Sequence, residues 1–366
     1  MPLSVIAEHS ITVSQLRGLL SEQRTANMSD DEGAKQIRGM ELTEELTQRT
    51  LDGFVTEFKP GPKTIGALEM LADLSSFLAP PADWLPSTNP PDVAKQRAMM
   101  TAAAAYVANT LQHLPNFLAM RTTRSFDDSP LIISENGSAP RHTDLHLAGT
   151  FRQQITYREG HEVLEDPVPV DGTKRAHTSG SAGLSSWGEF GQVLAVILTD
   201  SMKGQMTWSR WEQTSSGTAA VFDFEIPSNA SHYLVDYCCV RRTEGPDPNH
   251  PWMANVKTPN SYRGTPGYHG ALYLDPNSGA ILRVTLQTEL KSSDPITRSD
   301  MTVLYGPVEI GGRTCICPVK SVAISSALTG LETELKEWMV LRVNDVTFTD
   351  YHRFGSSARI LPFAPE

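Results

Sequence analysis

The spacing of apolar residues along the chain changes near residue 115. Before this point, apolar residues recur every three or four positions, which is the period of an amphipathic helix. Such stretches cover 11–23, 65–78 and 93–114. Another begins at Thr43, a residue type that caps helices and that is followed here by acidic residues. The pattern predicts about five helices before residue 115.

After residue 115, apolar and polar residues alternate in short segments, as in strands with one buried and one solvated face. The segment 280–290 shows this most clearly, because Val284 and Leu286 share one face while Arg283 shares the other with polar neighbours. About nine or ten such segments are joined mostly by short glycine-containing turns, which is typical of an antiparallel sheet. One helical stretch, 186–204, interrupts them.

These patterns predict an α+β protein with two domains. Residues 1–115 would form a helical region, and residues 116–366 a large antiparallel β-meander with one inserted helix. A chain of 366 residues is long enough for this division, because single domains are usually shorter.

The net charge and the apolar runs disfavour nucleic-acid binding and a transmembrane location. The net charge is −11, which disfavours nucleic acid, because binding to phosphates depends on Lys and Arg. The longest apolar runs, 99–108 and 193–198, are far shorter than the roughly 20 residues that cross a bilayer, so we expect no transmembrane segment. Residues 1–10 lack the basic and apolar regions of a signal peptide.

The four cysteines lie in two pairs on predicted strands. Cys315 and Cys317 are two positions apart and share a face, whereas the adjacent Cys238 and Cys239 point to opposite faces. Four sulfur atoms in this arrangement do not converge on a zinc ion. Two interpretations stay open: buried free thiols, or a disulfide between Cys239 and Cys317, which would indicate an oxidising compartment.

One short segment offers metal-binding chemistry. His142, Asp144 and His146 alternate, so in an extended segment their side chains would share a face and could hold a divalent metal ion. The alternative is a polar loop that leads into a strand. The sequence has no nucleophile elbow, phosphate-binding loop or dinucleotide-binding motif. We therefore expect no cofactor and favour a protein that is not an enzyme, although a catalytic site assembled from distant residues stays open.

Several segments resemble a family of uncharacterised proteins that is abundant in Acidobacteria. They are "HLPNFLAMRTTRSFDD", "MTWSRWE", "YHGALYLDPNSGAILRVT" and "VLYGPVEIGGRTCICPVKSVAIS", and the likeness extends over roughly residues 11–355. Members of that family are regarded as exported and carry no assigned activity. The resemblance implies a periplasmic or secreted protein, while a cytoplasmic location stays open.

The order of elements also resembles the fold of periplasmic lipoprotein carriers of the LolA and LolB type, which RseB shares. The likeness lies in the long meander, the inserted helix and the closing strand pair around a Gly-Gly turn. It implies a sheet curled into an open half-barrel whose cavity holds acyl chains. No functional residue of those proteins can be matched to this chain, and a likeness of fold alone is a weak guide to function.

The leading hypothesis is a non-enzymatic envelope protein that binds a lipid, a lipoprotein or another hydrophobic ligand in the half-barrel. Aromatic residues on the predicted strands would either line such a cavity or fill a solid core. One alternative is a protein–protein interaction module that uses the acidic helical region, for a partner that the sequence does not identify. Another is a metal-dependent hydrolase that uses His142, Asp144 and His146. The aromatic residues in question are Trp208, Trp211, Phe222, Phe224, Tyr233 and Tyr273.

Overall fold

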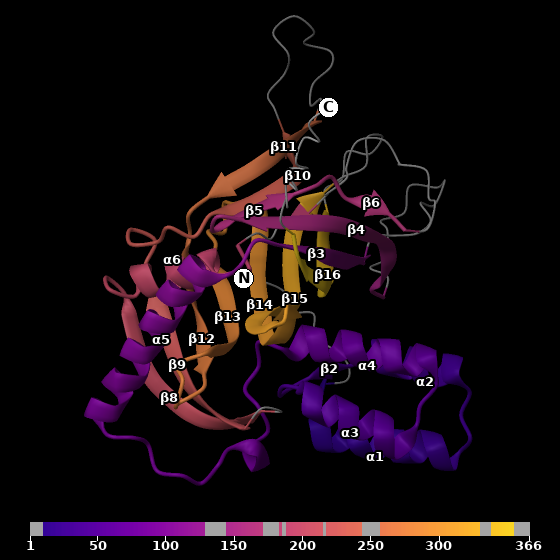
Figure 1. The fold of residues 1–366 in the computed structure, drawn as a ribbon. Coiled ribbons are helices and arrows are strands. Elements are labelled where there is room, and N and C mark those ends of the chain that lie inside the picture. The colour runs from indigo at the N-terminus through magenta and orange to yellow at the C-terminus, as the bar shows by residue number, and fades with distance from the viewer. Residues whose placement is uncertain are drawn as a thin grey trace, which may run out of the picture.

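The computed structural model describes residues 10–128, 144–170, 183–184, 188–214, 217–243, 257–329 and 338–354. Within them the chain forms six α-helices, one short 3-10 helix and a large antiparallel sheet, which confirms the predicted α+β class (Figure 1). The change from helices to strands also falls where the sequence indicates it, because α5 (Val93–His113) is followed by β3 (Phe117–Asp127).

Four helices near the N-terminus pack around a hydrophobic cluster of their own, which includes Leu16, Ile37 and Leu68. We call this group the helical cluster. Thr12 and Ser29 each form a capping box, which fixes where the first two helices begin. The elements are β1 (Ser10–Ile11), α1 (Val13–Thr25), α2 (Asp30–Arg38), β2 (Glu41–Leu42), α3 (Gln48–Phe58) and α4 (Pro62–Ser75), and β1 pairs with β2 in parallel.

The third helix begins later than the sequence predicts. Thr47 caps α3, because its side chain accepts a hydrogen bond from the backbone N–H of Thr50, and the expectation that Thr43 caps it is therefore wrong. Glu45 and Leu46 bond instead to the last residue of α4 and the segment after it. The backbone N–H of Glu45 donates to the Ala79 carbonyl oxygen at 2.9 Å, and the N–H of Leu46 donates to Ser75 Oγ at 3.1 Å.

Helices α5 and α6 (Gln192–Asp200) lie apart from the helical cluster and cover one face of the sheet (Figure 1). Val107 of α5 and Ile197 of α6 are buried in one hydrophobic cluster with residues of the strands, and we call it the main core. The short helix η1 (Ala82–Trp84) precedes α5. The inserted helix that the sequence predicts is therefore confirmed as α6. None of the helices in the described part of the chain combines the length and apolar character needed to cross a membrane.

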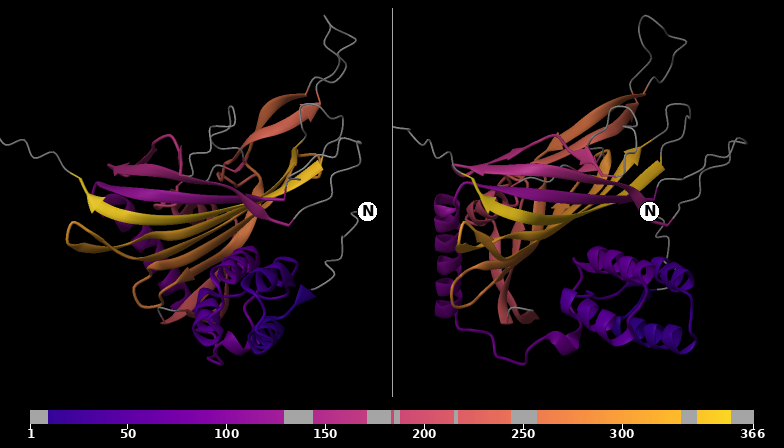
Figure 2. Two further views of the ribbon diagram at one scale, coloured as in Figure 1. Left: turned by 90° about the vertical axis from the view of Figure 1, so that its right-hand side faces the viewer. Right: turned by 45° about the vertical axis from the view of Figure 1, so that its right-hand side comes forward.

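The main sheet has 11 strands in the order β5-β4-β3-β16-β15-β14-β13-β12-β9-β8, with β6 paired to β4. Because β5 and β8 stand at the two ends of this order, the sheet is open, and Figure 2 shows that it curves strongly. Besides β3, its strands are β4 (His146–Arg158), β5 (His161–Leu164), β6 (Val168–Pro169), β8 (Gln205–Thr214), β9 (Gly217–Ile226), β12 (Gly267–Leu274), β13 (Ile281–Glu289), β14 (Ile296–Ile310), β15 (Arg313–Thr329) and β16 (Trp338–Arg353).

A small second sheet contains β7 (Gly183–Leu184), β10 (Val235–Thr243) and β11 (Lys257–Gly264) in the order β11-β10-β7. Its strand β10 packs on the main sheet. Val235 and Tyr237 are buried there against Ile296, Ala323 and Ala327.

Of the two interpretations of the cysteines, the structure favours free thiols. Cys317 carries a free thiol, so the predicted disulfide to Cys239 is wrong. Strand β10 packs against Ala323 and Ala327 of β15 through Val235 and Tyr237. Cys317 is buried in a different cluster, beside Phe117.

The two faces of the main sheet differ in character, as the alternation in the sequence indicates. Phe222 and Val284 are buried in the main core beneath α5 and α6. Asp223 and Arg283, their neighbours along the strands, lie on the opposite face, which we call the polar face. The helical cluster lies on the side of this polar face (Figure 2).

Candidate functional site

Five of the six aromatic residues considered for ligand binding belong to the main core. Phe222 and Phe224 are each 2% exposed, and Trp208, Trp211 and Tyr233 pack against the same cluster. The Trp208 ring meets Trp211 at a centroid distance of 4.8 Å and Phe222 at 5.4 Å, in edge-to-face geometry. These rings pack as residues of a core do, which is the second of the two interpretations left open by the sequence.

The residues considered for metal binding are described only in part. His142 lies outside the described residues, and Asp144 is exposed. The ring of His146 contacts the Asp144 carbonyl oxygen through Nδ1 at 3.3 Å and Asp127 Oδ1 through Nε2 at 3.6 Å. Among the residues that the structure describes, no group of three or more His, Cys, Asp or Glu side chains is placed to hold a metal ion.

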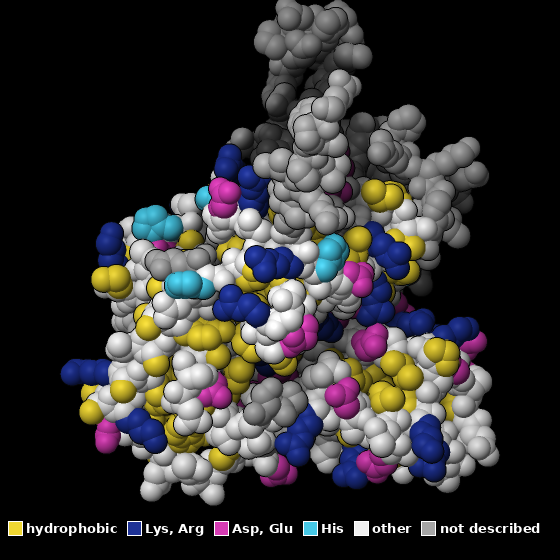
Figure 3. Space-filling view, viewed as in Figure 1, with side chains coloured by type: hydrophobic (Ala, Val, Ile, Leu, Met, Phe, Trp, Pro, Cys, Tyr) yellow, Lys and Arg dark blue, Asp and Glu magenta, His cyan; other side chains and the backbone are white. Residues whose placement is uncertain are grey.

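A cleft lies between the helical cluster and the polar face of the sheet. It contains a smaller hollow of about 150 Å³ and a larger, more open hollow of about 480 Å³, and both have Ser76 and Tyr273 in their walls. The smaller hollow is bordered by the start of α3, the end of α4 and strands β8 and β12–β15. The larger one is bordered by the segment after α4 and by β8, β9, β12 and β13. Over the side drawn in Figure 3, basic and acidic side chains are interspersed rather than gathered into one large patch of either sign.

Tyr273, the sixth aromatic residue, lies in this cleft rather than in the main core. Arg283 on β13 places its guanidinium carbon 4.9 Å from the centre of the Tyr273 ring. Arg210 on β8 donates to the Tyr273 hydroxyl at 3.1 Å and to Glu212 Oε2 at 2.8 Å. Burial raises the pKa of Tyr273 to about 12, so its hydroxyl stays neutral at physiological pH.

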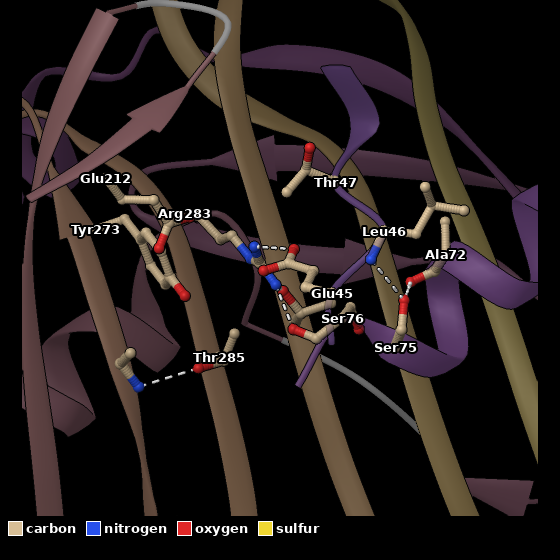
Figure 4. A network of polar contacts seen from close by, with 12 residues as sticks. Glu45, Leu46, Thr47, Ala72, Ser75, Ser76, Glu212, Tyr273, Arg283 and Thr285 are labelled. Atoms are coloured by element: carbon tan, nitrogen blue, oxygen red, sulfur yellow. Dashed lines mark hydrogen bonds and ion pairs between the residues drawn. The ribbon is translucent and has the colours of Figure 1, made fainter. Parts of the chain in front are cut away.

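Arg283 joins the sheet to the helical cluster (Figure 4). Its Nη1 lies 2.5 Å from Glu45 Oε1, its Nη2 donates to the Ser76 carbonyl oxygen, and its Nε donates to Thr302 Oγ1 at 3.3 Å. The contact with Ser76 follows the general preference for a cation at a helix C-terminus, since Ser76 is the C-terminal capping residue of α4. All three nitrogen atoms of this guanidinium are therefore engaged.

A second set of ion pairs fastens α4 to the sheet beside the smaller hollow. Lys320 Nζ lies 2.5 Å from Asp73 Oδ1 and 3.7 Å from Asp345 Oδ1. Arg124 binds Asp345 and also reaches Glu69 Oε2 at 3.1 Å. Burial raises the pKa of Asp73 to about 7, even though Lys320 opposes this effect. The walls of the smaller hollow are thus held by charged contacts between distant parts of the chain.

One oxygen atom in the wall of the smaller hollow has no hydrogen-bond donor. Glu45 is only 4% exposed, and while its Oε1 is bound by Arg283, its Oε2 is buried without a hydrogen-bond partner. Burial raises the pKa of Glu45, and the nearby carboxylate of Glu212 adds to the rise. A buried acceptor without a donor is costly to the folded state.

Two acidic residues, the half-buried Glu162 and the buried Glu189, lie near the start of α6 and away from the cleft. Glu162 on β5 accepts hydrogen bonds from the backbone N–H groups of Gly188 at 3.1 Å and Phe190 at 3.0 Å. Glu189 is 1% exposed, and its Oε1 lies 3.6 Å from a nitrogen of Arg121. Burial and repulsion from Glu189 raise the pKa of Glu162 to about 7. The arrangement holds the segment before α6 against β5.

The sequence hypotheses did not include the residues that shape the cleft, apart from Tyr273. Arg283 was assigned to a solvated strand face, and Glu45 to the first turn of a helix. The signal available was the alternation of charged residues on 280–290, which shows that a face is polar but not which element covers it. No protein-family model, no curated protein and no solved structure matches this chain.

Proposed function

We propose that this protein is a non-enzymatic binding protein whose ligand lies in the cleft between the helical cluster and the polar face of the sheet. The observation that carries the proposal is the pair of adjoining hollows, about 150 Å³ and 480 Å³, at the boundary of two parts of the fold. Binding sites are commonly found at such boundaries. The charged contacts of Arg283 and Lys320 keep the walls in place without a ligand, which lowers the cost of binding.

The lining of the larger hollow favours an amphipathic ligand over a purely apolar one. Phe77, Leu78 and Ala79, which follow α4, supply an apolar wall. The strands supply polar and charged side chains opposite this wall. The ligand we propose therefore differs from an acyl chain held in an apolar barrel, because five of the six aromatic residues that would line such a barrel pack in the main core. The polar part of the lining is Gln205, Thr207, Arg210, Asp223, Glu225, His269, Thr285, Gln287 and Glu289.

We propose the cell envelope as the place of action, and this part of the proposal is supported only by the family resemblance. The free thiol of Cys317 removes the argument from a disulfide. Cell fractionation of the native host with an antibody against this chain tests the location. Recovery of the protein with cytoplasmic markers would contradict it.

The binding site is tested by blocking the larger hollow. The probes are four amphiphiles with eight-carbon chains, used below their micelle concentrations: octylammonium, octanamide, octyltrimethylammonium and octanoate. Isothermal titration calorimetry should detect at least one of them at one site per chain. The variant Thr207→Trp should abolish this binding, because Thr207 is exposed on edge strand β8 and lines the hollow.

The matched control is Val168→Trp, which adds the same ring at an exposed position on β6, near the other end of the sheet. It should leave binding unchanged. The proposal is contradicted if none of the four amphiphiles binds, or if Thr207→Trp and Val168→Trp bind equally well.

A further inference from the structure

We infer that the larger hollow selects a cationic ligand, an organic ammonium compound with an apolar chain, through the carboxylates of Asp223 and Glu225. This inference rests on the proposed function, because it names the charge of the ligand that the same cleft binds. It commits to a positive charge, with or without N–H donors, rather than to a neutral or an anionic group.

The first argument is the position of the two carboxylates. Asp223 and Glu225 are two residues apart on β9, so their side chains lie on the same face of the sheet, and both border the larger hollow. Both residues are exposed, so a group that enters the hollow can reach their charged oxygen atoms. The apolar wall formed by residues 77–79 borders the same hollow and can hold the chain of the ligand.

The second argument is that neither carboxylate has a cationic partner. The residues opposite them on β8 and β12 are Thr207, Gln205, Ala271 and His269. None of the four is Lys or Arg, although opposite charges on facing positions are a common way to stabilise a sheet. Among the described residues, the side chains of Asp223 and Glu225 form no hydrogen bond or ion pair. Their charge is therefore available to a ligand.

The third argument is that the Arg side chains near this hollow are already matched by other acids. Arg210 borders the hollow and binds Glu212 Oε2 through Nε at 2.9 Å and through Nη2 at 2.8 Å. Arg298 places its guanidinium carbon 5.9 Å from the centre of the Phe77 ring, and its Nε lies 2.5 Å from Asp300 Oδ2. Each guanidinium thus has a carboxylate of its own.

His269 and Glu289 also border the hollow and lie close to each other, with His269 Nδ1 3.5 Å from Glu289 Oε1. Glu289 matches the charge of this ring when the ring is protonated. Asp223 contributes to the field at Arg210 but forms no ion pair with it. The charges of Asp223 and Glu225 therefore stay unmatched whether His269 is charged or neutral. A cation in the hollow is attracted, and an anion is repelled.

The four amphiphiles test the sign of the charge without any substitution. Octylammonium and octyltrimethylammonium are cations with and without N–H donors, octanamide is neutral, and octanoate is an anion. At pH 7 and low salt, calorimetry should show both cations binding roughly tenfold more tightly than octanoate, with octanamide between them. Added salt should reduce this preference, because salt screens the charges of exposed residues.

The double variant Asp223→Asn/Glu225→Gln tests the two carboxylates. It keeps the size of both side chains and removes their charges, so the preference for the two cations over octanamide should disappear, while octanamide binds as before. The matched control is Glu22→Gln/Glu41→Gln, which removes two exposed charges from the helical cluster at positions that border neither hollow. The control has the same net charge as the double variant and should keep the preference.

The outcomes separate this inference from the proposed function. If octanoate binds as tightly as the two cations while Thr207→Trp still blocks binding, the cleft is a ligand site and the inference about its charge is overturned. A preference for cations that survives in Asp223→Asn/Glu225→Gln overturns it as well, and so does a preference that the control variant loses equally. If no probe binds the unaltered protein, both proposals fall.

Discussion

The guanidinium of Arg283 lies 2.5 Å from the carboxylate of Glu45, although 238 residues separate them in the sequence. Both side chains are largely buried, with 13% and 5% of their surfaces exposed. This contact links the middle of the sheet to the segment before α3. It therefore sets the position of the helical cluster over the polar face and shapes the cleft between them.

Removing one member of the Arg283–Glu45 ion pair should destabilise the folded protein. We expect Arg283→Leu to lower the free energy of unfolding by about 3–5 kcal/mol, because it leaves a buried carboxylate without its partner. The double variant Arg283→Leu/Glu45→Leu should lose less, since neither charge of this pair is left without its partner. Urea denaturation followed by circular dichroism measures both. The control Arg17→Leu breaks an exposed pair with Glu57 and should cost less than about 1 kcal/mol. A double variant that is less stable than Arg283→Leu would contradict this account.

Glu162 should make stability depend on pH. The pKa of its carboxyl is about 7 in the folded protein, above the ordinary value of 4.5, because burial and Glu189 disfavour the charged form. The folded state then binds a proton more tightly than the unfolded state. The resulting stabilisation is complete below pH 4.5 and is lost as pH rises through about 7, with a slope of at most ~1.4 kcal/mol per pH unit.

Chemical denaturation between pH 4 and pH 8 checks this effect of Glu162. The variant Glu162→Gln stays uncharged throughout this range, so its unfolding free energy should fall less steeply with pH than that of the unaltered protein. Parallel curves for the two proteins would show that Glu162 does not titrate in this way.

Alanine substitutions at Gly270 and Gly66 should change the free energy of unfolding in opposite directions. At Gly270 on β12, an added Cβ would collide with the carbonyl oxygen of Thr285 on the neighbouring strand, so Gly270→Ala should cost roughly 1–3 kcal/mol. At Gly66 in α4, an added Cβ meets no atom within 4 Å, so Gly66→Ala should stabilise the protein by about 0.5–1 kcal/mol. Thermal unfolding of the two variants gives both signs. A stabilising Gly270→Ala would contradict the close approach of β12 and β13.

Phe222 should behave as a core residue. It is buried in the main core and meets Trp208 edge-to-face, so Phe222→Ala should lower the unfolding free energy by about 3–5 kcal/mol. The control Val168→Ala removes an exposed apolar side chain and should stay within about 0.5 kcal/mol of the unaltered protein. Urea titration measures both. A Phe222→Ala variant of unchanged stability that lost amphiphile binding would place this ring at a ligand site instead.

The sequence predicted what periodicity can reveal and missed what depends on contacts between distant segments. The alternation around Phe222 and Val284 identified the faces of β9 and β13 correctly. The same alternation placed Arg283 in solvent, because it carries no information about α4 lying over that face. Glu45 was expected in the first turn of a helix capped by Thr43. The backbone bonds from Glu45 and Leu46 to the residues at and after the end of α4 hold this segment outside α3 instead, so tertiary contacts override the local preference for a helix.

The cysteines illustrate the same limit. Alternation correctly placed Cys315 and Cys317 together on one strand, β15. Which strand lies opposite each thiol depends on the order of the sheet, and that order is not readable from spacing alone. The proposed disulfide therefore failed at the step where neighbouring strands had to be chosen.

The pairing of β3 with β16 has a consequence for how the chain reaches its native state. In the sheet, β3 touches β4 on one side and β16 on the other, with Phe126 opposite Val343. On the ribosome, β3 and β4 are synthesised long before β16. The edge of β3 that pairs with β16 in the native sheet therefore has no partner while most of the meander is synthesised. Such late, long-range closure slows folding and leaves a strand edge open to wrong partners. β16, the last of the described strands to be made, is thus the one that joins β3 to β15 in the sheet.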